Sequence, residues 1–161
     1  MPPARGVTGL GLGAVVAAAA AAIAFAWGAR AEPLHGMTSP QAMYLLRCSG
    51  CHVSDGRGAV SAGIPPFETS IGHLAGDAEG RLYMVSVPGV AGSGLSPEQK
   101  ASVLNYIVER WRGEAAQPER FTSAEVARLA QVRPADVVSL RRRIVDRFAS
   151  RGVRLADYPW R

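Results

Sequence analysis

The sequence predicts an all-α fold, because residues 32–111 carry three helix start signals, with turn-rich loops between them and no strand pattern beside them. The chain has 161 residues and 48% of them are apolar, which suits one modest domain with a tail or targeting segment and excludes two large domains. Charged residues make up 19% and the net charge is +5. This composition is that of a globular chain and excludes a disordered or collagen-like one.

Three helices are predicted in residues 32–111, and each begins at a residue that caps a helix well. Ser and Asp side chains accept a hydrogen bond from the first turn, and proline fits there because it needs no backbone donor. The third start is the clearest, since Ser96 and Gln99 form a capping box and an apolar face of helical period continues to Trp111. The predicted starts are Ser39-Pro40 (a helix leading into Cys48), Asp77-Ala78-Glu79 (a helix through Met84, stopped at Pro88-Gly89) and Ser96-Pro97.

The N-terminal segment is a run of apolar and small residues from Val7 to Trp27, preceded by Arg5 and followed by Ala29-Arg30-Ala31. This order is typical of a secretory signal peptide with an A-x-A cleavage site. Residues 1–31 are therefore predicted to be a signal peptide, and the rest of the chain is expected in the periplasm. The run of 21 residues is also long enough to cross a bilayer. An uncleaved anchor, with membrane association through residues 7–27, therefore stays an alternative.

The two cysteines of the chain lie in Cys48-Ser49-Gly50-Cys51-His52. This C-x-x-C-H spacing is the signature of covalent haem attachment, because each thiol can add to one vinyl group of the same haem and the histidine is then held under the iron. A redox dithiol lacks its βαβ context, a zinc site lacks further ligands at a suitable spacing, and a disulfide here closes too small a loop to stabilise much. The predicted cofactor is one covalent haem c with its iron.

Residues 32–111 resemble a class I, monohaem cytochrome c domain. The resemblance rests on the haem motif and on Tyr44 before it, Asp55-Gly56-Arg57-Gly58 and Pro65-Pro66-Phe67 after it, and a last helix from Leu95 to Trp111. It implies a small all-α fold wrapped around the haem, with the first and last helices crossing near Tyr44 and Tyr106. It also implies that a backbone carbonyl near Pro65 accepts a hydrogen bond from the second ring nitrogen of His52.

The sixth iron ligand departs from the family pattern. The family usually takes it from a methionine in the loop before the last helix, but residues 87–94 contain neither Met nor His. Met84 lies just upstream and is the first candidate, although it also fits a buried helix end. His73 is the second candidate, and an open or externally filled site is the third. A thioether would favour a higher potential than a histidine, and an open site would bind small ligands.

Residues 112–161 form a basic extension with eleven Arg and six acidic residues, joined to the body by a Gly/Ala/Pro linker. A capping box at Thr122 and a second apolar helix face ending at Phe148 predict a helical hairpin. Another face of the second helix carries arginines at i, i+4 spacing, namely Arg143, Arg147 and Arg151. We expect a solvated face on a hairpin packed against the body, or else a docking arm for an acidic protein or anionic lipid headgroups.

These patterns together predict a periplasmic electron carrier that passes single electrons between a dehydrogenase and the respiratory chain. No catalytic residue is expected, because the haem carries the chemistry. A periplasmic redox partner protein is expected, whereas a nucleic-acid partner is not. Two alternatives stay open: a haem-based gas-binding or sensor module with an open sixth position, and a cytochrome subunit held in an oxidoreductase complex.

Overall fold

The structure is a computed structural model that describes residues 39–156. Those residues form helices and loops, and their β-structure is limited to one isolated bridge between Ala59 and Ile64. The predicted all-α class is therefore confirmed. The signal peptide or anchor predicted for residues 1–31 lies outside the described residues. Between residues 39 and 156, no helix is long and apolar enough to cross a membrane.

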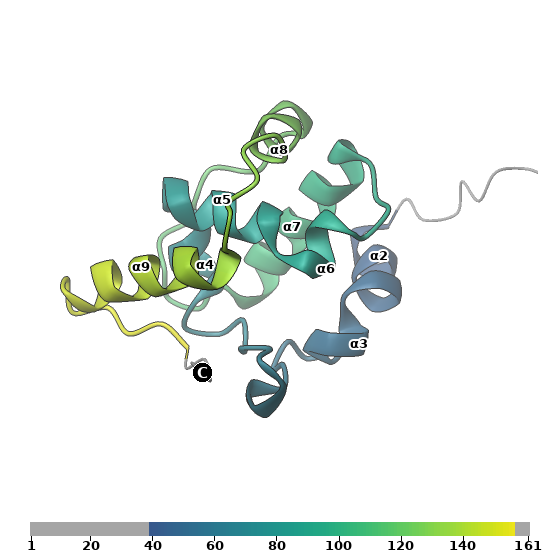
Figure 1. Cartoon of the computed structure of the whole chain (residues 1–161). Coiled ribbons are helices and arrows are strands. Elements are labelled where there is room, and N and C mark those ends of the chain that lie inside the picture. Colours follow the sequence, from purple (N-terminus) through teal and green to yellow (C-terminus); the bar gives the residue numbers. More distant parts are fainter. Residues whose placement is uncertain (1–38, 157–161) are drawn as a thin grey trace, which may run out of the picture. The chain divides into compact units, whose positions relative to one another are not determined.

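Two helices, α5 and α7, hold the described part of the chain together. Helix α7 packs against α2, α4 and α8, and α5 packs against α4, α6, α8 and α9. Figure 1 shows α7 between α2 and the yellow α9, which lie on opposite sides of it. In chain order the helices are α2 (Pro40–Arg47), α3 (Ser49–His52), the 3-10 turn η1 (Val60–Ala62), α4 (Ile71–Ala75), α5 (Ala78–Ser86), α6 (Pro88–Ala91), α7 (Pro97–Trp111), α8 (Ser123–Leu129) and α9 (Val137–Ala149).

The three helices predicted for the body begin where expected. Asp77 caps α5 by accepting a hydrogen bond from Gly80 N at 2.9 Å. At α7, Ser96 Oγ accepts from Gln99 N at 3.2 Å and Gln99 Oε1 accepts from Ser96 N at 3.0 Å, so the capping box is complete. Ser39 caps α2 through its side-chain oxygen, which accepts a hydrogen bond from Ala42 N at 3.5 Å. The cap residues therefore set the starts of all three helices.

The body also contains short helices that the sequence did not predict. Helix α5 ends at Ser86, just before the predicted stop at Pro88. Pro88 is also the first residue of another helix, α6. Helix α4 lies in a segment expected to be loop, since five residues are too few to show a helical period. It packs very closely on α5: a Cβ on Gly80 would lie 2.2 Å from the carbonyl oxygen of Leu74. Only glycine fits this contact.

The extension is built into the hydrophobic core of the body. Helix α8 packs on α7 and α5, and α9 packs on α5. The apolar side chains of both helices join the core cluster of the body, with Val126, Leu140 and Ile144 at most 1% exposed. The predicted pair of helices is present, but the two dock separately on the body rather than packing mainly on each other as a hairpin.

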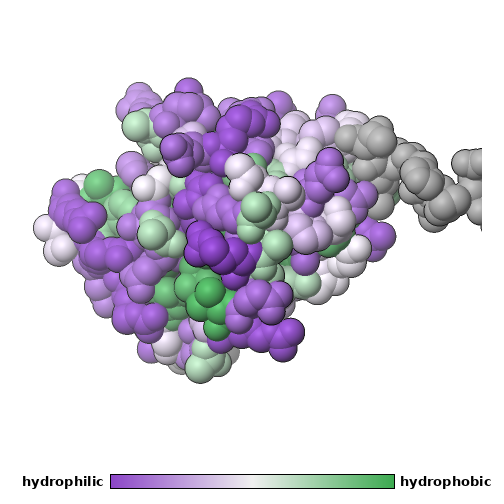
Figure 2. Space-filling view, turned by 90° about the horizontal axis from the view of Figure 1, so that it is seen from above, coloured by the Kyte–Doolittle hydropathy of each residue, from purple (hydrophilic) through white to green (hydrophobic). Residues whose placement is uncertain are grey.

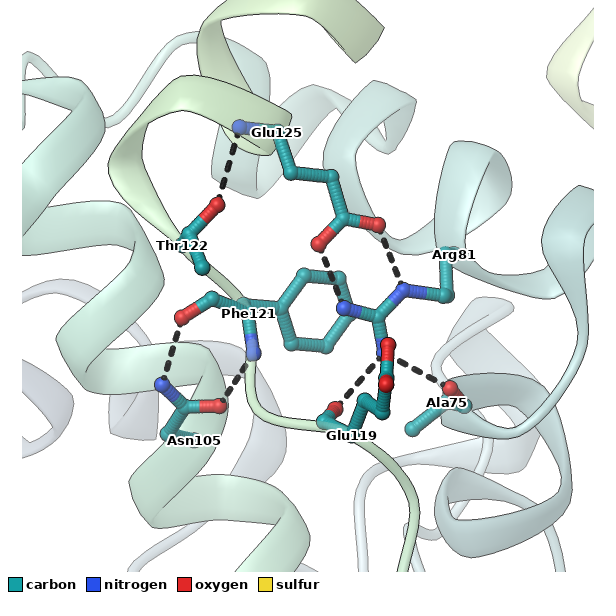
Figure 3. A network of polar contacts seen from close by, with 7 residues as sticks. All are labelled: Ala75, Arg81, Asn105, Glu119, Phe121, Thr122 and Glu125. Carbon is teal, nitrogen blue, oxygen red and sulfur yellow. Dashed lines mark hydrogen bonds and ion pairs between the residues drawn. The ribbon is translucent and has the colours of Figure 1, made fainter.

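Arg81 on α5 is the main polar link between body and extension (Figure 3). Its guanidinium donates to both carboxylate oxygens of Glu125, at 2.6 and 2.5 Å. It also donates to the carbonyls of Ala75 at 2.8 Å and Glu119 at 2.9 Å. The guanidinium carbon lies 3.8 Å from the centre of the Phe121 ring, close enough for a cation–π contact. One arginine thus binds α4, the linker and α8 at once.

A second link fastens the residue that precedes α8 (Figure 3). The side-chain amide of Asn105 on α7 donates to the carbonyl of Phe121 at 3.0 Å and accepts from its N–H at 2.8 Å. Thr122 then caps α8 by accepting from Glu125 N at 3.1 Å. Because the Glu125 carboxylate pairs with Arg81, the capping box predicted at Thr122 forms only in part.

Arg147 does not belong to an exposed basic stripe, contrary to the sequence prediction. Its two terminal nitrogens donate to Asp77 at 2.6 Å and to Glu79 at 2.7 Å, at the start of α5. Arg143 and Arg151 are exposed as predicted. The middle arginine of the predicted stripe therefore ties α9 to α5, because the helix start next to it offers two carboxylates.

We expect Glu125→Gln to lower the free energy of unfolding at neutral pH by about 2 kcal/mol, because it removes charge-assisted hydrogen bonds in a partly buried pair. The hydrogen bond from Arg81 holds the pKa of Glu125 below its ordinary value of 4.5. This contribution is therefore fully present above pH 4.5 and is lost as the pH falls through the lower folded-state pKa. Denaturant unfolding at neutral and acidic pH measures it.

Glu119→Gln is the matched control for that experiment, because the network uses the Glu119 backbone carbonyl and its side chain is exposed. The control should unfold like the wild-type protein. Equal stability of Glu125→Gln and wild type at neutral pH, or an unchanged difference between them in acid, would show that the ion pair does not hold the extension in place.

Candidate cofactor site

A cavity of about 440 Å³ brings together all five site residues that the sequence indicates: Cys48, Cys51, His52, Pro65 and Met84. Its volume falls within the range of roughly 300–1,000 Å³ typical of small-molecule and cofactor sites. Most of the remaining wall is apolar and comes from the loop before α4 and from α4, α5, α6 and α7. These lining residues include Ile64, Pro66, Phe67, Ile71, Leu74, Val87, Val90, Leu104 and Ile107.

The C-x-x-C-H motif forms a single helical turn in this wall. Cys48 is the N-cap residue of α3, and its carbonyl accepts hydrogen bonds from Cys51 N at 3.2 Å and His52 N at 3.0 Å. Positions three apart lie on one side of a helix, so both thiols can reach the same group. The cysteines are free; Cys48 is half-buried and Cys51 is exposed. Burial raises the pKa of the Cys48 thiol.

The His52 ring is held by stacking on Phe67, with ring centres 4.2 Å apart and planes inclined by 19°. Burial lowers the pKa of His52 to about 4, so the imidazole is neutral at neutral pH, which is the form that binds metals. The buried Nδ1 has no hydrogen-bond partner among the described residues. The hydrogen bond expected at a carbonyl near Pro65 is therefore not formed, although Pro65 lies in the same wall.

The chain turns back on itself directly after the motif. Val53 adopts a φ of 61°, a left-handed conformation that is rare for a β-branched residue, and its carbonyl accepts a hydrogen bond from the Tyr44 hydroxyl. Gly58, with a φ of 65°, lies against the loop segment that contains Ile64 and Pro65. A Cβ on Gly58 would be 2.4 Å from the Ile64 carbonyl oxygen and 2.8 Å from the Pro65 carbonyl oxygen. This tight turn brings Pro65 to the motif.

An aromatic cluster supports the motif from behind. The ring of Tyr44 on α2 lies 4.9 Å from Trp111, 5.9 Å from Tyr106 and 6.3 Å from Phe67, measured between ring centres. Helices α2 and α7 therefore meet at Tyr44 and Tyr106, as the family resemblance implies. Because Phe67 also stacks on His52, the cluster links the packing of these helices to the position of the imidazole.

The candidates for a sixth ligand lie in different places. Met84 on α5 is 3% exposed and lines the cavity. His73 on α4 does not line it, and its ring faces Phe148, with centres 5.7 Å apart. Met43 is 1% exposed but belongs to the core of α2 and is not part of the cavity wall. Met84 is therefore the candidate that the fold brings together with His52.

The first turn of α9 completes the cavity wall, which the sequence did not indicate. Asp136, Val137, Val138 and Arg141 line the cavity from the extension. Arg141 is only 1% exposed although it carries a charged side chain. The sequence feature that could have indicated the burial of Arg141 is its position. Arg141 falls within the apolar stripe of α9, four residues after Val137, and not on the face that carries Arg143 and Arg147.

The described part of the molecule also exposes apolar surface. Figure 2 shows an apolar area in the middle of one face, framed by hydrophilic residues. Among the exposed large apolar residues are Leu45 and Leu46, at the end of α2 just before Cys48. Apolar surface with a polar rim is typical of a region that binds another molecule.

Comparison of the chain with models of protein families and with curated proteins finds no match. Among residues 39–156, no three His, Cys, Asp or Glu side chains gather into a group that could hold a metal ion on their own.

Proposed function

We propose that this chain is a c-type cytochrome that carries single electrons on one covalently attached haem. The observation that supports this most strongly is the meeting of the C-x-x-C-H motif with Met84 around one apolar cavity. The motif alone, or a methionine near a cavity alone, would support a haem site less strongly than the two together. Their convergence supplies attachment points and two candidate iron ligands in the same place.

The residues of the site fit a haem. Cys48 and Cys51 would hold the haem through two thioether bonds, each formed by addition of a thiol S–H across one vinyl group, with the sulfur bound to one vinyl carbon and the hydrogen to the other. The addition has no leaving group and no net oxidation. His52, through a ring nitrogen, and Met84, through its thioether sulfur, would be the two iron ligands that the protein provides. A bound haem iron supplies the one-electron redox couple.

The rest of the cavity wall has an electrostatic role in this proposal. The apolar side chains around Met84 exclude water from the iron, which disfavours the more highly charged ferric state and raises the reduction potential. Phe67 keeps the His52 ring in position by stacking. No side chain is assigned as a general acid, a general base or a nucleophile in turnover, so the protein is proposed as a carrier and not as an enzyme by itself.

The location and partners of the carrier follow from the sequence patterns. The segment 1–31 supports export to the periplasm, with an uncleaved anchor as the alternative. A periplasmic redox protein is the proposed partner. Exposed Arg143 and Arg151 would favour an acidic surface on it, whereas Arg147 is engaged inside the molecule.

A potentiometric titration tests the function, using protein produced in a host that attaches haem to exported chains. We expect one reversible one-electron transition for each molecule, and no spectral change when carbon monoxide is added to the reduced protein. Tight carbon monoxide binding by the wild-type protein would instead support the gas-binding or sensor module. Reversible electron uptake that occurs only in association with a co-purifying oxidoreductase would support the subunit alternative.

A further inference from the structure

We propose that the C-terminal extension keeps Met84 in place as an iron ligand, through the ion pairs that Arg147 of α9 forms with Asp77 and Glu79 at the start of α5. These contacts are called the α9–α5 ion pairs below. The inference rests on the proposed function and goes beyond it, because it gives the extension a part in iron ligation, whereas the sequence suggested a solvated face or a docking arm. The three residues are positioning residues that act through α5.

The packing of α5 is the first argument, because this helix carries Met84. The described helices that pack closely on α5 are α4, α6, α8 and α9. Helices α4 and α6 are its neighbours in the chain and have only five and four residues. The other two, which come from a remote part of the chain, are the helices of the extension. The position of α5 in the fold therefore depends on the extension as well as on its chain neighbours.

Arg147 contacts α5 at the residues where this helix begins. Its terminal nitrogens donate to Asp77 at 2.6 Å and to Glu79 at 2.7 Å. The Asp77 oxygen that accepts from Arg147 also accepts from Gly80 N at 2.9 Å, which is the cap of α5. The side chains of Arg147 and Asp77 are 31% and 18% exposed, so water and salt screen their contact less than they screen a surface ion pair.

Helix α5 connects these contacts to Met84. Met84 follows Asp77 by seven residues, which is about two helical turns. A helix of this length is a rigid element, so a movement of its start also moves Met84. Gly80 adds to this, because a Cβ there would lie 2.2 Å from the Leu74 carbonyl oxygen, so the start of α5 has little room to shift against α4. A ligand side chain must stay within about 0.5 Å of its productive position, which requires such support.

The extension contacts α5 a second time, one turn further along. Arg81 of α5 donates to both carboxylate oxygens of Glu125 on α8, at 2.6 and 2.5 Å. Both helices of the extension are therefore fixed to α5 at residues that precede Met84. Because Arg81 and Glu125 remain when Arg147 is replaced, loss of the α9–α5 ion pairs should loosen Met84 without releasing the extension.

The experiment measures how fast Met84 leaves the iron in oxidised protein with attached haem. At saturating concentration, cyanide binds to the iron at the rate at which the methionine sulfur dissociates. Arg147→Gln should raise this limiting rate about tenfold, which corresponds to about 1.4 kcal/mol and is near the lower end for a hydrogen bond to a charged group. The near-infrared sulfur-to-iron band should also disappear at a lower temperature than in the wild type. Arg147→Lys keeps the charge and should show a smaller increase.

Two controls separate the positioning of Met84 from a general loss of stability. Arg120→Gln removes an arginine that pairs with Glu109, away from α5. Val103→Ala truncates a side chain on α7 that is 2% exposed and does not line the cavity, so it lowers the stability of the fold without altering the contacts of Arg147. Both should keep the wild-type cyanide rate. A wild-type rate in Arg147→Gln, or an equal increase in either control, would overturn the inference.

Asp77→Asn changes the same contact from the side of α5 and covers the case in which Arg147→Gln does not fold. Asparagine caps a helix about as well as aspartate, so the cap of α5 is kept while the charge that pairs with Arg147 is removed. The cyanide rate should rise here as well, and an unchanged rate would overturn the inference. Attached haem without a sulfur-to-iron band in the wild type would overturn this inference but not the proposed electron carrier, whereas absence of attached haem would overturn both.

Discussion

If Met84 ligates the haem iron as proposed, replacing it by alanine should remove the weak near-infrared sulfur-to-iron band of the oxidised protein and allow carbon monoxide to bind to the reduced protein. Met84 is buried and lines the cavity, and it comes from a different helix than His52, so the two candidate ligands reach the cavity from separate elements. Loss of the thioether should also lower the reduction potential, because a methionine ligand favours the ferrous iron. Covalent attachment should be unaffected, since it depends on the cysteines.

Met43→Ala is the matched control for this variant. Met43 is 1% exposed and Met84 is 3% exposed, so both substitutions remove a buried side chain and should cost about 2–5 kcal/mol of stability. Met43 does not line the cavity, and its variant should therefore keep the band. If Met84→Ala kept the band as well, Met84 would be an ordinary core residue. His73→Ala would then test the second candidate.

A Trp111→Ala variant should lose about 3–5 kcal/mol in its free energy of unfolding, the cost typical of truncating a large aromatic core residue. The Trp111 ring lies 4.9 Å from Tyr44, 5.3 Å from Phe67 and 6.0 Å from Tyr106, between ring centres. A Cβ on Gly56 would lie only 2.8 Å from the indole, so the loop after the motif packs directly on it. Urea unfolding monitored by circular dichroism measures the change.

Leu46→Ala is the control for Trp111→Ala, because it removes an apolar side chain from α2, the helix that packs on α7. Leu46 is 69% exposed, and its variant should stay within about 0.5 kcal/mol of the wild type. If Trp111→Ala were as stable as this control, the aromatic cluster would not be what joins α2 to α7. The position of Phe67 against His52 would then need another explanation.

The helix starts of this chain could be predicted because helix capping is local chemistry. Ser96 and Gln99 satisfy each other's backbone groups within four residues, and Asp77 reaches a donor three residues away. No tertiary contact is needed to recognise such signals. The short helices α4 and α6 could not be found in this way, since they have neither a side-chain cap nor enough length for an apolar period.

The polar links between body and extension could not be predicted, because they join residues far apart in the sequence. Arg147 fits the i, i+4 arginine pattern of α9, yet its partners Asp77 and Glu79 lie on another helix. Glu125 fits a capping box, yet Arg81 takes its carboxylate. In both cases a tertiary ion pair engages a side chain for which the sequence indicated another role: an exposed position for Arg147 and a local cap for Glu125.

The candidate site was predicted in part, for a related reason. The motif Cys48 to His52 is contiguous, so its residues must lie together. Met84 was the first of three alternatives because it lies just upstream of residues 87–94, and its place in the cavity wall depends on how α5 packs. Arg141 had no local signal beyond its position in an apolar stripe, because only the docking of α9 on α5 brings it to the cavity.

The central claim is that Cys48 and Cys51 hold one haem covalently, and mass spectrometry of the denatured protein tests it most directly. Protein from a host with haem-attachment machinery should have the mass of residues 32–161 plus one haem after acid–acetone treatment, or the mass of the whole chain plus one haem if residues 1–31 are retained as an anchor. The peptide containing residues 48–52 should carry that haem through two thioether bonds, and a Cys48→Ser, Cys51→Ser double variant should not. Haem that is extracted by acid–acetone, or a wild-type peptide with two free thiols, would contradict the account.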